Sequence, residues 1–400
     1  MRLILVPLFS FYIFLAGAQP GLQPIGSWRE YLPYHSAVDV TTSTKKIYCA
    51  TPFSLFSVDI ITNEINRISK ISGLSETGIS TIKFDAASDK LFIAYTNSNI
   101  DVVDAKKINN IPDLKRENIA GDKTIYHIYP QNNLCYLSTG IGVIIIDVEK
   151  YEVKDSWFIG NGGSQVKVNM FTADNTFFYA ATEDGLKKTP VNTYNPADYN
   201  AWENLSGVNG LPAGRCKGVI NLQNDIVALI NDSVFVQMGN SWRLLFANGW
   251  PITSINSSED KLLICQRTAS GDSKVVVVNA NGSIVKNIQQ PEVISFPKSA
   301  IVHNGEYWIA DLYGGLSHWY GNEFEQYKLN SPEDIATGEM LVYNNTLYAA
   351  AGSVNSAWNY QYNSAGIYKF ENGQWTNYNR FKFKQLDSLL DFITVAVDKR

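Results

Sequence analysis

The chain contains the run Lys90-Leu91-Phe92-Ile93-Ala94-Tyr95, in which an anchor residue precedes five apolar or aromatic residues. Aromatic and branched residues of this kind favour extended strands. Similar runs recur along the chain: Lys46-Ile47-Tyr48-Cys49-Ala50, Asn133-Leu134-Cys135-Tyr136-Leu137, Thr176-Phe177-Phe178-Tyr179-Ala180, Asp225-Ile226-Val227-Ala228-Leu229, Lys261-Leu262-Leu263-Ile264-Cys265, Glu306-Tyr307-Trp308-Ile309-Ala310 and Thr346-Leu347-Tyr348-Ala349-Ala350. Successive anchors are 44, 43, 43, 49, 36, 45 and 40 residues apart. A period near 43 residues is typical of the blades of a β-propeller.

Each unit has room for four strands. A mostly apolar innermost strand precedes the anchor run, as in residues 79–84 and 299–302. A third strand follows a turn with Gly, Asn or Asp, and a shorter, more polar outer strand often carries a Trp, as in residues 240–244 and 373–378. The sequence therefore predicts an all-β fold, a β-propeller of about seven to eight four-stranded blades, with blade-like units from about residue 36.

The first eighteen residues have the pattern of a secretory signal peptide. Arg2 supplies a positive charge, residues 3–15 form an apolar run, and residues 16–18 are small. No later stretch approaches the ~20 apolar residues that span a bilayer. We therefore expect an exported chain with a signal peptide at 1–18, a β-propeller at 19–400 and no transmembrane segment after processing.

The two ends of the repeat array repeat strand patterns. Residues 26–31 copy the outer-strand pattern and so offer a way to close the ring by joining the last blade. Residues 393–398 repeat the innermost-strand pattern, and 380–400 are therefore interpreted as the start of a further blade or of a second propeller. On this interpretation the chain is the N-terminal fragment of a longer two-propeller protein.

Composition limits the function. Of the 400 residues, 45% are hydrophobic and 18% charged, and the formal net charge is -5. That charge has the wrong sign for a protein that binds nucleic acid by neutralising phosphates. Cys49, Cys135 and Cys265 lie in apolar runs and Cys216 begins another, so we expect buried free thiols, with a disulfide as the alternative.

Motifs for chemistry are missing: the sequence has no HExxH, GxSxG or Walker-type phosphate loop. The four histidines are scattered and are expected to be ordinary hydrogen-bonded or exposed residues: His35, His127, His303 and His318. Four aromatic residues near unit tips are expected to pack in the core or rim, with sugar stacking as the alternative: Trp308, Tyr313, Trp319 and Trp358. The loops at 72–75, 209–212 and 248–251 indicate tight crossovers between blades, and the alternative is that they line a ligand-binding face.

Two further possibilities concern charged residues. A propeller can bring carboxylates from different blades together at its axis, which one sequence cannot show. An anionic ligand would need a local basic patch, for which the candidate groupings are interpreted first as solvated surface charges: Lys106 with Lys107, Lys187 with Lys188, and Arg380, Lys382 and Lys384.

A resemblance to known proteins rests on particular residues. The stretch 72–82 with Asp85, followed by 91–95 and 99–104, resembles the propeller repeats of two-component regulators. Together with 28–35, 47–51 and 55–59 in front, the chain resembles the PorZ family, accessory proteins of the type IX secretion system of Bacteroidota. The resemblance is dense over about residues 26–190 and looser to 400.

The resemblance implies a non-enzymatic protein without cofactors, at the outer-membrane surface or in the periplasm. It implies that the partners are a cargo-processing sortase, other type IX secretion components and anionic lipopolysaccharide or another glycan. No family binding residues match a motif here, so catalytic, cofactor and metal residues are assigned to none, and the ligand-binding residues are left open. The alternatives are a ligand-sensing periplasmic propeller of a two-component regulator and a carbohydrate-active propeller enzyme.

Overall fold

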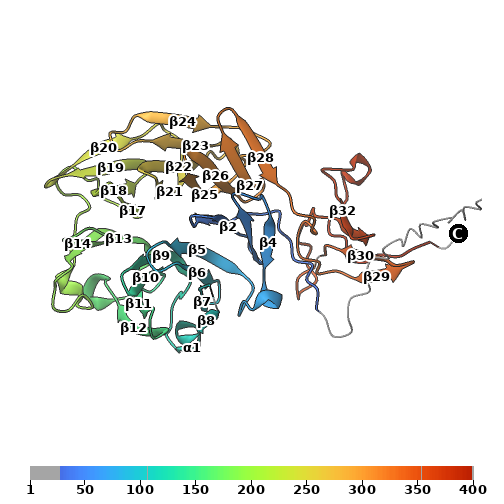
Figure 1. Ribbon diagram of the computed structural model, residues 1–400, viewed down its shortest axis with the longest axis horizontal. Helices are drawn as coiled ribbons and strands as arrows, with labels where there is room; N and C mark the ends of the chain where they lie inside the picture. Colours follow the sequence, from blue (N-terminus) through green and yellow to red (C-terminus); the bar gives the residue numbers. More distant parts are fainter. Residues whose placement is uncertain (1–27, 106, 353, 399–400) are drawn as a thin grey trace, which may run out of the picture. The chain divides into compact units, whose positions relative to one another are not determined.

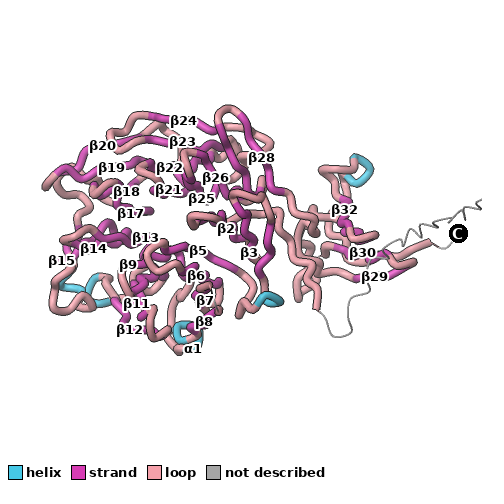
Figure 2. Tube along the Cα trace, viewed as in Figure 1, coloured by secondary structure: helices cyan, strands magenta, loops and turns pink. Residues whose placement is uncertain are grey.

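The computed structural model describes residues 28–105, 107–352 and 354–398. In these residues the chain forms eight four-stranded antiparallel sheets, and in each sheet the strands follow one another in chain order (Figures 1 and 2). The prediction of an all-β fold built from four-stranded blades is therefore confirmed. None of the described helices is long and apolar enough to cross a membrane.

The first four sheets span residues 39–204. Their strands are β1 (Asp39–Thr42), β2 (Lys46–Ala50), β3 (Leu55–Asp59), β4 (Ile65–Ile68), β5 (Ile79–Asp85), β6 (Lys90–Tyr95), β7 (Ile100–Val103), β8 (Ile108–Ile111), β9 (Ile125–Gln131), β10 (Leu134–Thr139), β11 (Val143–Asp147), β12 (Glu152–Trp157), β13 (Val168–Ala173), β14 (Phe177–Thr182), β15 (Gly185–Pro190) and β16 (Glu203–Asn204).

The other four sheets span residues 216–378. Their strands are β17 (Cys216–Leu222), β18 (Asp225–Ile230), β19 (Ser233–Met238), β20 (Ser241–Phe246), β21 (Ile252–Ser258), β22 (Lys261–Arg267), β23 (Ser273–Val278), β24 (Ile284–Ile288), β25 (Pro297–His303), β26 (Glu306–Asp311), β27 (Gly315–Tyr320), β28 (Glu323–Tyr327), β29 (Met340–Tyr343), β30 (Thr346–Ala350), β31 (Ile367–Glu371) and β32 (Gln374–Tyr378). The described helices are single turns: α1 (Asp113–Arg116), η1 (Lys70–Ser72), η2 (Asn161–Gly163), η3 (Tyr199–Ala201) and η4 (Lys384–Leu386).

Seven of the sheets form a closed ring. The first strands of neighbouring sheets pack against one another from β1 to β25, and β25 packs in turn against β1. An apolar cluster fills each space between neighbouring sheets. The cluster that closes the ring joins Phe56 of the first sheet to Trp308 and Leu316 of the seventh. Burial of these large side chains, at roughly 25 cal/mol per Å² of apolar surface, makes the interfaces between blades the main source of stability.

The eighth sheet, β29–β32, has its own small apolar cluster around Ala349, Ala351 and Tyr368. Since β25 packs on β1, seven blades complete the ring without this sheet. Residues 393–398 contain no strand, although residues 392 and 393 bond to the backbone of Gly352 and Glu339.

No strand is formed by residues 28–31, the described part of the segment that offered a way to close the ring. Residues 26 and 27 lie outside the described residues, as does the signal peptide predicted at 1–18, and residues 28–31 are not in a strand. The first and seventh sheets are each built from four consecutive strands, so neither needs a strand from elsewhere. The apolar cluster around Trp308 and the hydrogen bond between Thr42 and His303 hold the seam.

The innermost strands differ from their neighbours and from one another in burial. In β21 only two of seven residues are buried, whereas five of seven are buried in the next strand, β22. The same holds for β9 and β10. Burial varies among the innermost strands, since β17 and β25 each bury five of seven residues. An innermost strand has no neighbouring strand on its channel side. Water and side chains must therefore form hydrogen bonds with the backbone N–H and C=O groups of that edge.

The crossover loops agree with their local interpretation. Gly73, Gly210 and Gly249 all have positive φ angles, of 107°, 90° and 78°. At Gly210 a Cβ atom would lie 2.6 Å from the carbonyl oxygen of Trp242. The tight turn between blades thus requires glycine at this position.

Candidate functional site

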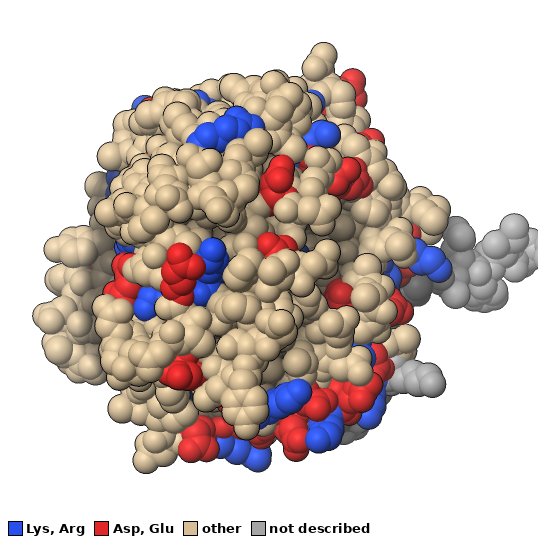
Figure 3. All heavy atoms as spheres, turned by 90° about the vertical axis from the view of Figure 1, so that its left-hand side faces the viewer, with Lys and Arg blue, Asp and Glu red and all other residues tan. Residues whose placement is uncertain are grey.

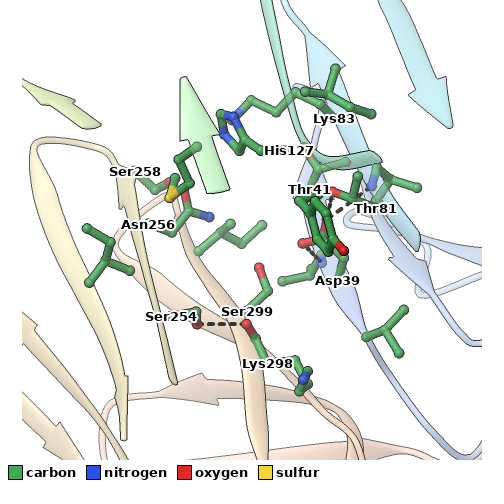
Figure 4. Close-up of a pocket in the computed structure, with 18 of the residues that line it drawn as sticks. Asp39, Thr41, Thr81, Lys83, His127, Ser254, Asn256, Ser258, Lys298 and Ser299 are labelled. Atoms are coloured by element: carbon green, nitrogen blue, oxygen red, sulfur yellow. Dashed lines mark hydrogen bonds between the residues drawn. The ribbon is translucent and has the colours of Figure 1, made fainter. Parts of the chain in front are cut away.

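The seven innermost strands surround a channel cavity of about 450 Å³. Every one of these strands contributes to its lining, and many of the side chains are hydroxyls and amides (Figure 4). The polar residues of the lining include Asp39, Thr41 and Thr42 of β1, Thr81 and Lys83 of β5, His127 of β9, Asn169 of β13, Lys217 of β17, Ser254, Asn256 and Ser258 of β21, and Lys298 and Ser299 of β25.

Some of these polar side chains form hydrogen bonds between neighbouring blades. Four side chains of β21 donate hydrogen bonds to backbone carbonyls of β25: Thr253 to Pro297, Ser254 to Lys298, Asn256 to Ala300 and Ser258 to Val302, at 2.7–3.2 Å. Each bond joins residues 44 positions apart, which is one repeat. The donors of these side chains are therefore already bonded to backbone carbonyls at the exposed edge of β25.

The acidic residue Asp39 is engaged in the same way between the first two blades. One of its carboxylate oxygens accepts the Thr81 hydroxyl at 2.7 Å and the Ile82 N–H at 3.0 Å, and the other accepts the Val40 N–H. With three donors on one carboxylate, the Asp39 side chain is held in a fixed position.

A second cavity of about 310 Å³ lies next to the first. The residues that line both cavities mark the place where the two meet: Lys83, Phe84, His127, Ile128, Met170, Asn256 and Ser257. Figure 4 shows the side chains of Lys83 and His127 next to each other, on β5 and β9. Lys83 and His127 are the residues with titratable side chains among those that line both cavities.

The Lys83 ammonium forms no hydrogen bond or ion pair with the residues that the structure describes. Its side chain is only partly exposed, and desolvation lowers its pKa, although Asp39 and Asp85 act in the opposite direction. The neighbouring His127 ring accepts the Phe171 N–H at Nδ1, at 3.4 Å. Burial, helped by the positive charge of Lys83, lowers the pKa of His127 to about 3, so the imidazole is neutral at physiological pH.

The other three histidines have local partners. His303 Nδ1 lies 3.0 Å from the Thr42 hydroxyl across the ring seam, His318 Nε2 lies 2.7 Å from Glu306, and His35 Nε2 lies 3.3 Å from the Ser331 carbonyl. Among the described residues there is no group of His, Cys, Asp or Glu side chains that could hold a metal ion.

Most described members of the basic groupings have a partner within the fold. Lys106 lies outside the described residues, and Lys187 is buried, with its ammonium donating to the Ile159 carbonyl at 2.7 Å; the interpretation of Lys187 as a surface charge is wrong. Acidic partners lie close to three of the others: Lys188 pairs with Glu203, Arg380 with Asp387 and Lys382 with Glu333. On the face in Figure 3, basic and acidic side chains are interspersed among uncharged residues.

The aromatic candidates divide into two pairs. Trp308 and Trp319 are buried, and Trp308 stacks on the His318 ring with centroids 4.0 Å apart, so the packing interpretation holds for both. Tyr313 and Trp358 are 66% and 79% exposed. Neither of these exposed residues lines the channel cavities.

The four cysteines are buried and free, as predicted, and the disulfide alternative is wrong. Burial raises the pKa of the Cys216 and Cys265 thiols to about 12, so both are protonated and unreactive at neutral pH.

Comparison with known proteins agrees with this architecture. The model of the family described as TSS9, PorZ, N-terminal beta-propeller domain matches residues 47–203. PorZ from Porphyromonas gingivalis, an essential bacterial surface component of the type-IX secretion system of that organism, is 24% identical to this chain with a TM-score of 0.75. The chain resembles PorZ. The match covers 90% of this chain and 47% of that one, so the chain spans about half the length of PorZ.

A second solved structure shares the fold beside PorZ. The extracellular domain of a hybrid two-component system from B. thetaiotaomicron is 12% identical with a TM-score of 0.56, and the match covers 87% of this chain and 48% of that one. No curated protein matches the chain. The similarities to these two solved structures support the propeller fold. Among propellers, the family match points to PorZ.

Proposed function

We propose that the protein is a non-enzymatic accessory of the type IX secretion system. In this role it binds anionic lipopolysaccharide and presents it to the cargo-processing sortase. It is exported and works at the outer-membrane surface or in the periplasm. The observation that carries the proposal is the likeness to PorZ over 90% of the chain, together with the family match at residues 47–203.

The architecture supports a holding role. A closed ring of seven blades gives a rigid frame with loops on two faces and a polar channel. We also propose that the eighth sheet and residues 380–400 begin a second propeller, since the ring is complete without them.

Deletion of the gene in its own host tests the role. Secreted cargo is then expected to lose its attachment to the cell surface, and the full-length protein is expected to retain the sortase in a pull-down. Restoration by the wild-type gene is the control. Normal cargo attachment in the deletion strain would contradict the proposal.

A sensor propeller of a two-component regulator is the second candidate, favoured by the likeness to the extracellular domain from B. thetaiotaomicron. It predicts that the deletion changes transcription in response to a glycan while cargo remains attached. The same deletion strain therefore separates the two functions.

A further inference from the structure

Two hydrogen-bond donors meet where the channel cavities join. The Lys83 ammonium carries three N–H donors and has no acceptor among the described residues. Because His127 Nδ1 accepts the Phe171 N–H, the proton of the neutral ring lies on Nε2. No described residue accepts a hydrogen bond from Nε2 either.

The nearby carboxylates are committed to other donors. Asp39 accepts bonds from Val40, Thr81 and Ile82, and Asp85 accepts bonds from the backbone of Ala87 and Ser88 and from the Ser88 hydroxyl. They lower the cost of a buried ammonium through the field they exert, yet they leave its N–H groups unsatisfied. Partial burial of an ammonium without a hydrogen-bond acceptor costs free energy. A ligand that accepts hydrogen bonds from the ammonium offsets this cost, so such groups mark candidate binding sites.

The charged lining of the first cavity favours a negative ligand. It contains one carboxylate, Asp39, against the ammonium groups of Lys83, Lys217 and Lys298. Two of these lysines have partners within the fold, because Lys217 pairs with Asp232 and Lys298 lies over the Phe296 ring. Of the three, Lys83 is the one that lines both cavities, so it supplies the positive charge at their junction.

We propose that the junction of the two cavities binds a small oxyanion, a carboxylate or phosphate group, free or carried on a saccharide, with Lys83 and His127 as its donors. Cavities of about 450 and 310 Å³ on the two sides leave room for a sugar that bears the anion. The proposal does not depend on the role in secretion.

The test is calorimetric titration of the purified 400-residue chain with inorganic phosphate and with acetate at constant ionic strength. The variant Lys83→Met is expected to raise the Kd for phosphate about tenfold or more, because it removes the charge and keeps the length of the side chain. His127→Asn keeps an acceptor for the Phe171 N–H and removes the Nε2 donor, so an increase of about threefold is expected.

The matched control is Lys217→Met, which removes another channel ammonium that is already paired. It is expected to change the Kd by less than about twofold. An equal loss in Lys217→Met and Lys83→Met would mean that a diffuse positive field attracts the anion, and it would overturn the site. Failure of the wild-type chain to bind either anion would overturn it as well.

Two further arms identify the source of the anion. Glucose 6-phosphate and glucuronate are compared with inorganic phosphate and acetate, with neutral glucose as the reference. Tighter binding of the sugar-borne anions assigns the site to an acidic saccharide, and equal binding assigns it to the free anion; both support the proposal. Binding of glucose as tight as that of glucose 6-phosphate contradicts it.

A measurement on the wild-type chain tests the site without a variant, so its result does not depend on whether a variant folds. Reductive methylation with formaldehyde and a borane modifies accessible amines and is followed by mass spectrometry of peptides. Phosphate is expected to slow the methylation of Lys83 and leave Lys217 unchanged. Equal rates at Lys83 with and without phosphate would contradict the site.

Discussion

Strands β5 and β6 pair with each other in the second sheet, yet they differ in what they bury. In β6 five of six residues are buried. In β5 residues 83–85 are all partly exposed, and the strand faces the channel. Lys83 and Phe92 stand directly opposite each other in the register of this pair. One position thus points an ammonium into a cavity while its partner packs in the core between two blades. The comparison teaches that the second strands stabilise the ring and leave the inner strands free to carry ligand-facing groups.

The largest expected effect breaks the stabilising side of this comparison. Phe92 is 1% exposed within the cluster between the second and third blades. Phe92→Ala is expected to lower the free energy of unfolding by about 3–5 kcal/mol, because it leaves a cavity that the surrounding strands cannot fill. Urea unfolding measures the change. Ser80→Ala in β5, which loses one hydroxyl bond to the Ala94 carbonyl, is the control and is expected to cost about 1 kcal/mol. Equal costs for the two variants would contradict the comparison.

A smaller loss is expected where an inner strand depends on a side chain of its neighbour. Asp39→Ala removes the acceptor of the Thr81 hydroxyl and the Ile82 N–H, and it is expected to cost about 1–3 kcal/mol. Asp59→Ala removes bonds to the Ile61 and Thr62 N–H groups in an exposed turn, where water replaces the carboxylate. Thermal unfolding of the two variants side by side checks the difference. A larger loss in Asp59→Ala would mean that the links between blades contribute little.

The protonation of His127 gives the third effect. Its pKa is about 3 in the folded protein and near 6.5 when unfolded, so only the unfolded chain gains a proton as the pH falls below 6.5. Stability from this residue is therefore complete above pH 6.5 and is lost toward pH 3, by at most about 2 kcal/mol between pH 7 and pH 5. The charged neighbour that acts on the His127 ring is Lys83.

The measurement is urea unfolding of the wild-type chain and His127→Asn at pH 7, 6 and 5. The difference between the two proteins isolates His127 from the carboxylates that also titrate. Their stabilities are expected to converge as the pH falls. A difference that stays constant from pH 7 to pH 5 would show that His127 has an ordinary pKa.

The fold was predictable because the repeat is periodic. The anchor runs at 46–50, 90–95 and 133–137 became second strands, since apolar and aromatic residues there bury against both neighbouring blades. The closure of the ring was not predictable from strand patterns. It depends on contacts such as those of Phe56 with the Trp308 cluster, between residues about 250 positions apart in the chain.

The site was missed for a related reason. Lys83 lies inside the run 79–84, whose apolar residues alone supported its assignment as an innermost strand. His127 was considered only as one of several scattered histidines. A charged residue within an innermost run is a signal for a channel site, because that strand has one edge without a partner strand. The meeting of Lys83 and His127 depends on the register of two blades, since Lys83 pairs with Phe92 and His127 pairs with Ser138, and the sequence alone does not give that register.

The smallest expected effect sharpens the comparison at Lys83 itself. Desolvation without a hydrogen-bond partner makes its ammonium unfavourable in the unliganded chain, so Lys83→Met is expected to raise stability by up to about 1 kcal/mol. Lys298→Met is the control, because that lysine lies over the Phe296 ring and its loss is expected to be slightly destabilising. Urea unfolding in an anion-poor buffer measures both, and added phosphate is expected to stabilise the wild-type chain but not Lys83→Met. If Lys83→Met instead lowers stability by more than about 1 kcal/mol, the ammonium has a structural partner, and Lys83 serves the ring as Phe92 does.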